Sequence, residues 1–416
     1  MTAHRPTPEK GTNAVSPRGL LGNRDFQLLW SAQVLATTGV LSAAVALPML
    51  VLKRTDSAAV AGFVGFVVLI AAALTTLPGG RLADRYNRRA VLVCGAGGSA
   101  ISMGLLAVAV HIGLATIPVV LLLTALGGAL SGAFSSAGMA ALPQVVPAAQ
   151  LPTALATDTA RLAAAGLVGP VLAGVLFGVS PALPFSVAAV ALLVATACVM
   201  AIRTPLPAPA RAGATGWVTG LVFLWRDGVL RRITFVDTVH NAVFSAVPLL
   251  LVAIGLRQHH SSLSIGLVYA LISAGSLVGA LAATGLSRRL SPRGAILITC
   301  WSPAVLLAFS ALSPSLEVLA VALTVGCLVS PPADAVLASV RVVRTPDALQ
   351  GRTQAAVTLV GMCATPLGPP AAGLLLDHLN VSVALLVLAT SLAALAVVAT
   401  LSSQLRRVPM PGVADD

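Results

Sequence analysis

Charged residues are scarce in this chain. They make up 9% of its 416 residues, whereas hydrophobic residues make up 57%, and the mean hydropathy is +0.96. A water-soluble domain of this size and composition would have to expose large apolar patches, so the sequence excludes a soluble fold. It predicts an all-α polytopic membrane protein that is embedded in a lipid bilayer.

Clusters of residues that could carry chemistry are also few. The cysteines lie in apolar stretches without metal-ligand or disulfide spacing, at Cys94, Cys198, Cys300, Cys327 and Cys363. His259 and His260 are adjacent but have no further ligands nearby, and the chain has no Gly-x-x-x-x-Gly-Lys-Ser/Thr loop for a nucleotide. We therefore expect no metal site and no cofactor, and we find no set of side chains that suits an enzyme.

The net charge is nevertheless +12, a value that could indicate a nucleic-acid partner. The arginines are scattered over short connections between apolar runs rather than gathered on one soluble surface, so we expect no nucleic acid. Arginine outnumbers lysine by 23 to two, which favours a GC-rich bacterial genome. We therefore expect a multi-pass protein of the bacterial cytoplasmic (inner) membrane.

Twelve apolar runs are each long enough to cross a membrane as a helix, which takes about twenty residues. Basic residues concentrate in the even-numbered connections and near both ends, whereas only Lys53, Arg54 and Arg257 fall in the odd-numbered connections. By the positive-inside rule, both termini are cytoplasmic. The predicted spans are 27–50, 58–80, 90–111, 114–138, 153–177, 183–202, 231–255, 263–286, 294–312, 316–340, 353–376 and 382–402.

The longest connection divides the twelve spans into six and six. It contains three prolines followed by two glycines, and its residues 217–225 suit an amphipathic helix at the membrane surface. The predicted domains are a cytoplasmic tail at 1–25, a six-helix half at 26–202, a cytoplasmic central loop at 203–230, a second six-helix half at 231–402 and a cytoplasmic tail at 403–416.

An internal repeat supports this division. The segment Gly169-Pro170-Val171-Leu172-Ala173-Gly174 in span five recurs as Gly368-Pro369-Pro370-Ala371-Ala372-Gly373 in span eleven, 199 residues later. Repeated halves are typical of secondary transporters, which rock one half against the other around a site near mid-membrane. Chance similarity between two helices rich in Gly and Pro is the alternative.

The connection between spans two and three places one acid and four arginines between two apolar runs. With twelve spans in two halves, its segment Gly80-x-Leu82-Ala83-Asp84-Arg85-x-x-Arg88-Arg89 resembles the loop signature of the major facilitator superfamily. Asn87 stands where that signature usually has a second glycine, and Asn tolerates a left-handed turn nearly as well.

The resemblance implies a gate at this loop. Asp84 would hold the cytoplasmic ends of the two halves together in the outward-facing state. It would lie opposite the start of span eleven near Gly351 and Arg352, where a helix N-terminus favours an anion.

Span five carries a second resemblance. Gly166, Gly169, Pro170 and Gly174 are spaced as in the motif that marks exporters, or antiporters, of the superfamily. A structural interpretation fits the same residues, because small side chains let helices approach closely. Segments 142–147 and 345–352 narrow the resemblance to the enterobactin-exporter-like branch, which includes macrolide-efflux relatives.

Ionisable groups inside a membrane cost about 2.5–3.5 kcal/mol each on insertion scales, so those that persist are candidates for function. Asp158 and Arg161 in span five are three residues apart and can pair on one helix face. The pair could act as a gate or coupling element, or it could only orient the helix.

In span seven, Asp237, His240 and Asn241 share one helix face. The resemblance implies that spans one, four, seven and ten line the central cavity, which would place this trio beside the substrate. An Asp beside a His can hold or release a proton near neutral pH, as proton coupling requires. An interhelical hydrogen-bond cluster is the alternative.

Span ten contributes Asp334 just after Pro331-Pro332, where missing backbone donors favour an opening toward a cavity. Gln33 and Thr37 in span one are milder polar candidates, as are three serines of span four, Ser131, Ser135 and Ser136. Glu317 and Asp377 lie at predicted outer helix ends, where a charged side chain reaches water at little cost in free energy. Span four lacks the arginine of many proton antiporters, and Val40 stands where many branch members have an acid, so the proton route stays open.

We predict a transporter that exports a small organic molecule, such as a drug, a siderophore or another secondary metabolite, by proton antiport and acts as a monomer. Its energy source would be an ion gradient. A proton-linked nutrient importer is the alternative, and a membrane enzyme or scaffold is a remote one.

We expect Asp84→Asn to slow or uncouple transport while the protein still inserts and folds, because the variant loses the carboxylate of the implied gate. Transport rate in proteoliposomes and the amount of protein in the membrane measure the two effects. A normal transport rate in this variant would reduce the loop to a signal of topology.

Overall fold

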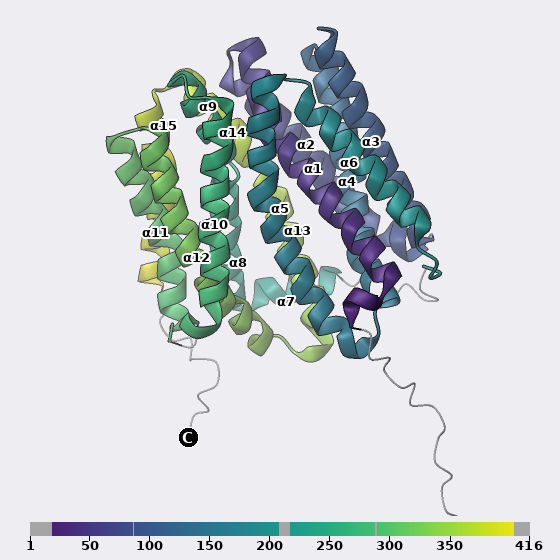
Figure 1. Cartoon of the computed structure of the whole chain (residues 1–416). Coiled ribbons are helices and arrows are strands. Elements are labelled where there is room, and N and C mark those ends of the chain that lie inside the picture. Colours follow the sequence, from purple (N-terminus) through teal and green to yellow (C-terminus); the bar gives the residue numbers. More distant parts are fainter. Residues whose placement is uncertain (1–18, 86, 208–216, 288, 403–416) are drawn as a thin grey trace, which may run out of the picture.

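The computed structural model describes residues 19–85, 87–207, 217–287 and 289–402. Within these ranges the chain forms helices and turns and no strand. Twelve of its segments are long and apolar enough to cross a membrane. The all-α fold class and the predicted number of spans are confirmed (Figure 1).

Most spans are single helices. They are α1 (Arg24–Thr55), α2 (Ala58–Arg85), α3 (Arg88–His111), α4 (Ile117–Val145), α5 (Leu151–Val179), α6 (Leu183–Ala201), α10 (Ser262–Leu286), α11 (Pro292–Leu312), α12 (Leu316–Arg344) and α15 (Val381–Leu401). Short 3-10 turns precede α1, α5 and α13, namely η1 (Leu20–Gly22), η2 (Ala148–Gln150) and η3 (Asp347–Leu349). The helix predicted at 217–225 is present as α7 (Trp217–Arg226).

Spans seven and eleven are each broken near their middle, whereas their apolar patterns predict continuous helices. Span seven consists of α8 (Gly228–Phe244) and α9 (Val247–Arg257). Span eleven consists of α13 (Gln350–Ala364), η4 (Thr365–Leu367) and α14 (Gly368–His378). Prolines lie in the first turn of α9, η4 and α14, where they leave no N–H for the preceding turn.

The two breaks pack against each other. Ser245, which follows α8, donates its hydroxyl hydrogen to the Thr365 carbonyl of span eleven, at 2.6 Å. Gly368 lies so close that an added Cβ would collide with Ser245 and with the Ala242 carbonyl. The backbone groups that the breaks free are thus partly satisfied between the spans, as a lipid environment requires.

Polar caps fix the starts of several helices. In five of them a Ser or Asn side-chain oxygen accepts the backbone N–H of the residue three positions later. The caps are Asn23 on α1, Ser261 on α10, Ser291 on α11, Ser315 on α12 and Asn380 on α15. These caps locate helix starts more closely than hydropathy, since each one satisfies a donor that no helical bond reaches.

The start of α1, the end of α15 and helix α7 lie at the same face of the bundle (Figure 1). We call it the basic face, because exposed arginines gather at its helix ends, at Arg24, Arg203, Arg226, Arg231 and Arg344. The opposite face carries Lys53 and Arg54 at the end of α1 and Arg257 at the end of α9.

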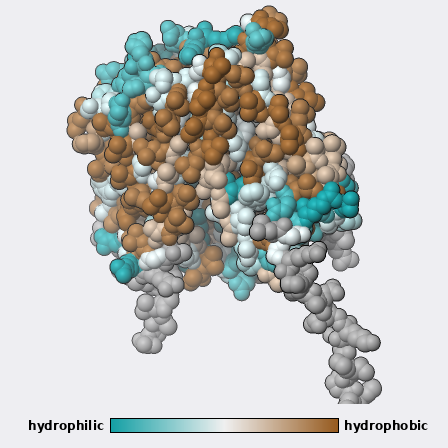
Figure 2. All heavy atoms as spheres, in the orientation of Figure 1, coloured by the Kyte–Doolittle hydropathy of each residue, from teal (hydrophilic) through white to brown (hydrophobic). Residues whose placement is uncertain are grey.

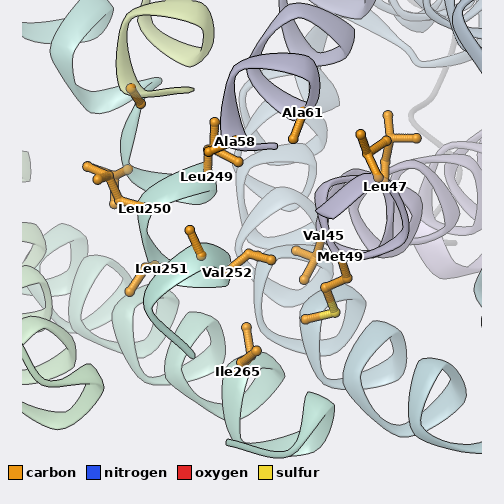
Figure 3. Close-up of a cluster of buried hydrophobic side chains, with 14 of the residues drawn as sticks. Val45, Leu47, Met49, Ala58, Ala61, Leu249, Leu250, Leu251, Val252 and Ile265 are labelled. Carbon is orange, nitrogen blue, oxygen red and sulfur yellow. The ribbon is translucent and has the colours of Figure 1, made fainter. Parts of the chain in front are cut away.

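Among the described side chains, the buried apolar core is continuous between the halves toward the opposite face. There, one cluster combines residues of α1 and α2 with residues of α9 and α10, among them Val45, Ala61, Leu250 and Ile265 (Figure 3). Toward the basic face, separate clusters serve the first half, around Leu92 and Leu192, and the second half. The halves are therefore packed together at the opposite face.

The repeated Gly-Pro segments lie at the two seams between the halves. A Cβ added to Gly174 in α5 would lie 2.5 Å from the Ser262 carbonyl oxygen at the start of α10. A Cβ added to Gly373 in α14 would collide with the Ala58 carbonyl at the start of α2. Each glycine lets its span approach the backbone of the other half, so the repeat in sequence matches a pair of contacts in space.

We expect Gly174→Ala to lower the melting temperature of the purified protein, because overpacking a tight contact costs about 1–3 kcal/mol. Gly178→Ala, one turn further along α5, is the matched control, since a Cβ there meets nothing within 4 Å. That control should be neutral or slightly stabilising, as Ala favours helix over Gly. Equal melting temperatures for both variants would show that the seam tolerates a larger residue.

Candidate functional site

A polar cavity of about 300 Å³ lies within the first half, between α1, α4 and α5. Its polar lining residues are Gln33, Thr37, Ser131, Ser135, Asp158 and Arg161. Four of the predicted site residues are thereby brought together from α1 and α5.

The predicted pair of Asp158 and Arg161 is present and buried. The Arg161 Nε donates to Asp158 Oδ1 at 2.8 Å. Its Nη1 reaches across to α1, where it donates to the Gln33 carbonyl at 3.1 Å and to the Thr37 hydroxyl at 2.5 Å. These extra acceptors offset the cost of burying a guanidinium, and they tie α5 to α1.

Gln33 itself is buried against α4. A Cβ added to Gly138 would lie 2.6 Å from the Gln33 Nε2 atom, so the amide fills the space that this glycine leaves. Gln33 therefore links the wall of the cavity on α1 to the wall on α4.

The second half places Asp237 in an ion pair with Arg341 of α12. The predicted bounds of span ten, 316–340, leave Arg341 just outside the span, in the connection that follows it. Because α12 continues to Arg344, Arg341 stays on a helix and reaches α8. The last turn of α12 contains Arg341 and Arg344. Hydropathy alone does not predict this turn as part of the span, because these two residues are basic.

His240 and Asn241 have other neighbours. The His240 ring stacks on Phe244, with 4.8 Å between the ring centroids and 22° between the planes. Its Nδ1 is buried and makes no hydrogen bond with the described residues. Asn241 is exposed and donates its side-chain N–H to the Asp237 carbonyl at 2.8 Å. The predicted trio thus shares a helix, but Asp237 and His240 do not bond to each other.

Asp334 lies seven residues before Arg341 on α12, and hence on the same helix face, two turns further from the basic face than Arg341. This is the side of α12 from which Arg341 reaches α8. Asp334 is exposed, and no ion pair joins it to a cation in the described part of the chain. No three His, Cys, Asp or Glu side chains among the described residues are grouped to hold a metal ion.

An apolar pocket of about 170 Å³ lies between the halves. Its lining includes Leu47 and Pro48 of α1, Gly65 of α2, Leu249 of α9 and Pro369 of α14. Along α1 it follows the polar cavity in the direction of the opposite face. Figure 2 shows the surface hollowed between the halves toward the basic face. Along α1 the pocket wall thus changes from polar in the first half to apolar between the halves.

Part of the loop signature lies outside the described side chains, namely Gly80, Asp84 and Arg85. Arg88 is buried and donates to the Ala140 carbonyl of α4 at 2.7 Å, and Arg89 donates to the Met200 carbonyl in the last turn of α6. These two arginines thus hold helices of the first half together, where a cation near a helix C-terminus is favourable.

The implied partner of Asp84 at the start of span eleven lies against α7. A Cβ added to Gly220 of α7 would collide with the Arg352 carbonyl. Gly351 is exposed and, with Arg341, lines a pocket of about 300 Å³. The gate role of Asp84 stays a prediction.

The span-five motif places α5 between α1 and α10. Gly166 accepts a hydrogen bond from the Ser273 hydroxyl of α10 at 2.8 Å. A Cβ added to Gly169 would lie 2.9 Å from Leu41 Cβ of α1. The Pro170 carbonyl lies against Gly266 of α10. Together with Gly174, these residues support close helix packing on both sides of the span.

Asp227 caps the start of α8 at the basic face. Partial burial of its carboxyl opposes ionisation, but hydrogen bonds from the backbone N–H groups of Leu230 and Val229, with the charge of Arg344, lower its pKa below 3.8. The ion pair with Arg344 measures 3.2 Å. Because the folded state lowers this pKa, the stabilisation is present above about pH 4 and is lost as the pH falls below it.

A comparison with family models matches residues 29–340 to the Major Facilitator Superfamily. The match covers most of the chain. The chain belongs to the major facilitator superfamily. The sequence resemblance to this superfamily is thereby confirmed.

Among the curated relatives of this superfamily member is the multidrug efflux pump Tap of Mycobacterium tuberculosis (strain ATCC 25618 / H37Rv). The two are 28% identical over 408 residues, covering 93% of this chain and 96% of the relative. Tap of Mycolicibacterium fortuitum is 27% identical over 380 residues, covering 88% of this chain and 92% of the relative.

Solved structures share the fold at low identity. The nucleoside transporter NupG has a TM-score of 0.71 and 14% identity, covering 92% of this chain and 100% of that one. A bacterial homologue of the iron transporter ferroportin in its inward-facing state has a TM-score of 0.68 and 17% identity, covering 92% and 100%. A D-xylose-proton symporter has a TM-score of 0.70 and 13% identity, covering 90% and 96%.

We expect Arg161→Ala to destabilise the protein strongly, because it leaves Asp158 buried without its partner, a change worth about 3–5 kcal/mol. The double variant D158N/R161Q removes both charges and should lose less stability. Arg293→Ala, at an exposed arginine on the basic face, is the control. Melting temperature and yield of folded protein rank the stabilities of the three variants. If Arg161→Ala is as stable as the double variant, the expectation is contradicted.

Proposed function

We propose that this transporter exports small amphipathic organic molecules, many of them cationic, from the bacterial cytoplasm by proton antiport. The observation that carries the proposal is the 28% identity, over 93% of the chain, to proteins named multidrug efflux pump. We further propose that it works as a monomer without a bound cofactor.

The proposed orientation places the basic face in the cytoplasm, and with it both termini. The distribution of arginine between the faces supports it through the positive-inside rule. In that orientation the structure corresponds to an inward-open state, because the halves share their core at the opposite face and the hollow between them opens at the basic face. Substrate would enter from the cytoplasm or the inner leaflet.

The proposed preference for cations follows from the charged side chains of α5, α8 and α12. Arg161 is neutralised by Asp158, and Arg341 is paired with Asp237. Asp334, on the face of α12 from which Arg341 reaches α8, is exposed and has no ion pair among the described residues. A cationic group would lie against Asp334, while the apolar remainder of the molecule fills the pocket near Leu47 and Leu249.

Antiport would then be a competition at one carboxylate. A substrate cation and a proton cannot both neutralise Asp334, so a proton that binds from the outside displaces the cation, and its release inside prepares the next cycle. The ion pair of Asp237 with Arg341 would be coupled electrostatically to the charge on Asp334, because Arg341 and Asp334 lie on the same face of α12. His240, stacked on Phe244, remains a second candidate for the proton route.

The direct test measures transport of ethidium, a fluorescent lipophilic cation, by the protein in proteoliposomes under an imposed pH gradient. We expect Asp334→Asn to abolish pH-driven transport, because an amide neither binds a proton nor attracts the cation. Asp347→Asn, at an exposed acid of the basic face, should transport as the unaltered protein does.

Direction is tested separately in cells that express the chain. Lower ethidium content than in control cells supports export. Accumulation of a labelled nutrient with protons would support the import alternative. Unchanged pH-driven transport in Asp334→Asn would exclude the proposed competition.

A further inference from the structure

The start of α2 at the opposite face has an unusual set of hydrogen-bond acceptors. Ser57 supplies two of them from its own chain segment: its hydroxyl oxygen accepts the Val60 N–H at 3.2 Å, and its carbonyl accepts the Ala61 N–H at 3.3 Å. The N–H groups of Ala58 and Ala59 remain, and a helix start without acceptors for them would be costly.

Asp377 supplies both missing acceptors from the other half of the molecule. It lies at the end of α14, and its two carboxylate oxygens accept the Ala58 N–H at 2.7 Å and the Ala59 N–H at 3.0 Å. The Ser57 hydroxyl donates to the same carboxylate at 2.7 Å. A carboxylate also interacts favourably with the positive end of the α2 dipole.

Two neighbours hold Asp377 in this position. Gly373, one turn earlier on α14, allows the close approach to the Ala58 carbonyl. Arg257 of α9 donates to the Leu376 carbonyl at 2.9 Å, which fixes the last turn of α14. The carboxylate is therefore placed by the packing of the seam rather than by a flexible loop.

The other seam has no counterpart. The repeat offset of 199 relates Asp377 to Gly178 of α5, where an added Cβ would meet nothing within 4 Å. The start of α10 is capped within its own half, since Ser261 accepts the Ser264 N–H at 3.1 Å. A seam between the halves can therefore form without an acid at the position of Asp377.

We infer that Asp377 is a gate residue that latches the two halves at the opposite face by capping α2 from α14. All three hydrogen bonds cross between the halves, so they must break when this face opens. The Ala58 and Ala59 N–H groups then pass to water. The inference needs only that the halves separate at this face during transport, whatever the substrate, coupling ion or direction.

The test is hydrogen–deuterium exchange with mass spectrometry on the full-length protein in lipid nanodiscs, without substrate. Replacing an N-cap residue by Ala lowers helix stability by an amount that changes the equilibrium between closed and open states by about tenfold. We expect Asp377→Ala to speed exchange by about tenfold at residues 57–61. Exchange should rise likewise at the start of α10, because the face opens as a whole.

Asn380→Ala is the matched control. Asn380 caps α15 at the same face but within one half, accepting the Val383 N–H at 2.8 Å. It should speed exchange at the start of α15 and leave α2 and α10 unchanged.

Ser57→Ala removes the hydrogen bond that the Ser57 hydroxyl donates to Asp377. It should speed exchange at the starts of both α2 and α10, but less than Asp377→Ala does. This second variant keeps the test valid if Asp377→Ala folds poorly. Faster exchange confined to residues 57–61 in either variant, or no change, would overturn the inference.

Discussion

Hydrocarbon offers no hydrogen bonds, and this constraint governs every polar group in the molecule. It confines the described chain to helices and turns, and it favours pairing of intramembrane charges, as in Asp158–Arg161 and Asp237–Arg341, whereas Asp334 has no ion pair among the described residues. Where backbone groups are freed, as at the breaks in spans seven and eleven, they are met by a side chain such as Ser245. Many Ser and Thr hydroxyls inside the bundle donate to a carbonyl one turn earlier on their own helix, as Thr124 and Thr299 do. The polar contacts that remain link particular helices.

The same constraint concentrates the contacts between the halves at one face. Apolar side chains of α1, α2, α9 and α10 share one core there, and glycines bring helix backbones close enough to exclude lipid. Asp377 adds a polar latch at that seam. Toward the basic face the described side chains form separate cores in the two halves. A polar cavity of the first half and an apolar pocket between the halves follow one another along α1.

Distance along the chain decided which site residues could be paired in advance. Asp158 and Arg161 are three residues apart, so helix geometry alone predicted their contact. Asp237 meets Arg341 and Ser57 meets Asp377 only because helices from distant segments pack together; the latter two are separated by 320 residues. Local spacing placed Asp237 and His240 on one helix face, and in the structure the His240 ring stacks on Phe244. The sequence places Asp377 at a helix end near water, where a charge costs little free energy and indicates no particular role. In the structure the end of α14 brings Asp377 to the start of α2.

The sequence by itself determined the class, the number of spans and the superfamily, and it predicted the division into halves from the repeat. Each of these depends on composition or on short-range pattern, since a span needs only about twenty apolar residues and a motif needs only its own spacing. The tertiary structure alone decided which charges pair, where spans seven and eleven break and which face is closed. Those features arise from contacts between helices, whose partners no local pattern specifies, so the closed face and its latch emerge only when the two halves are packed.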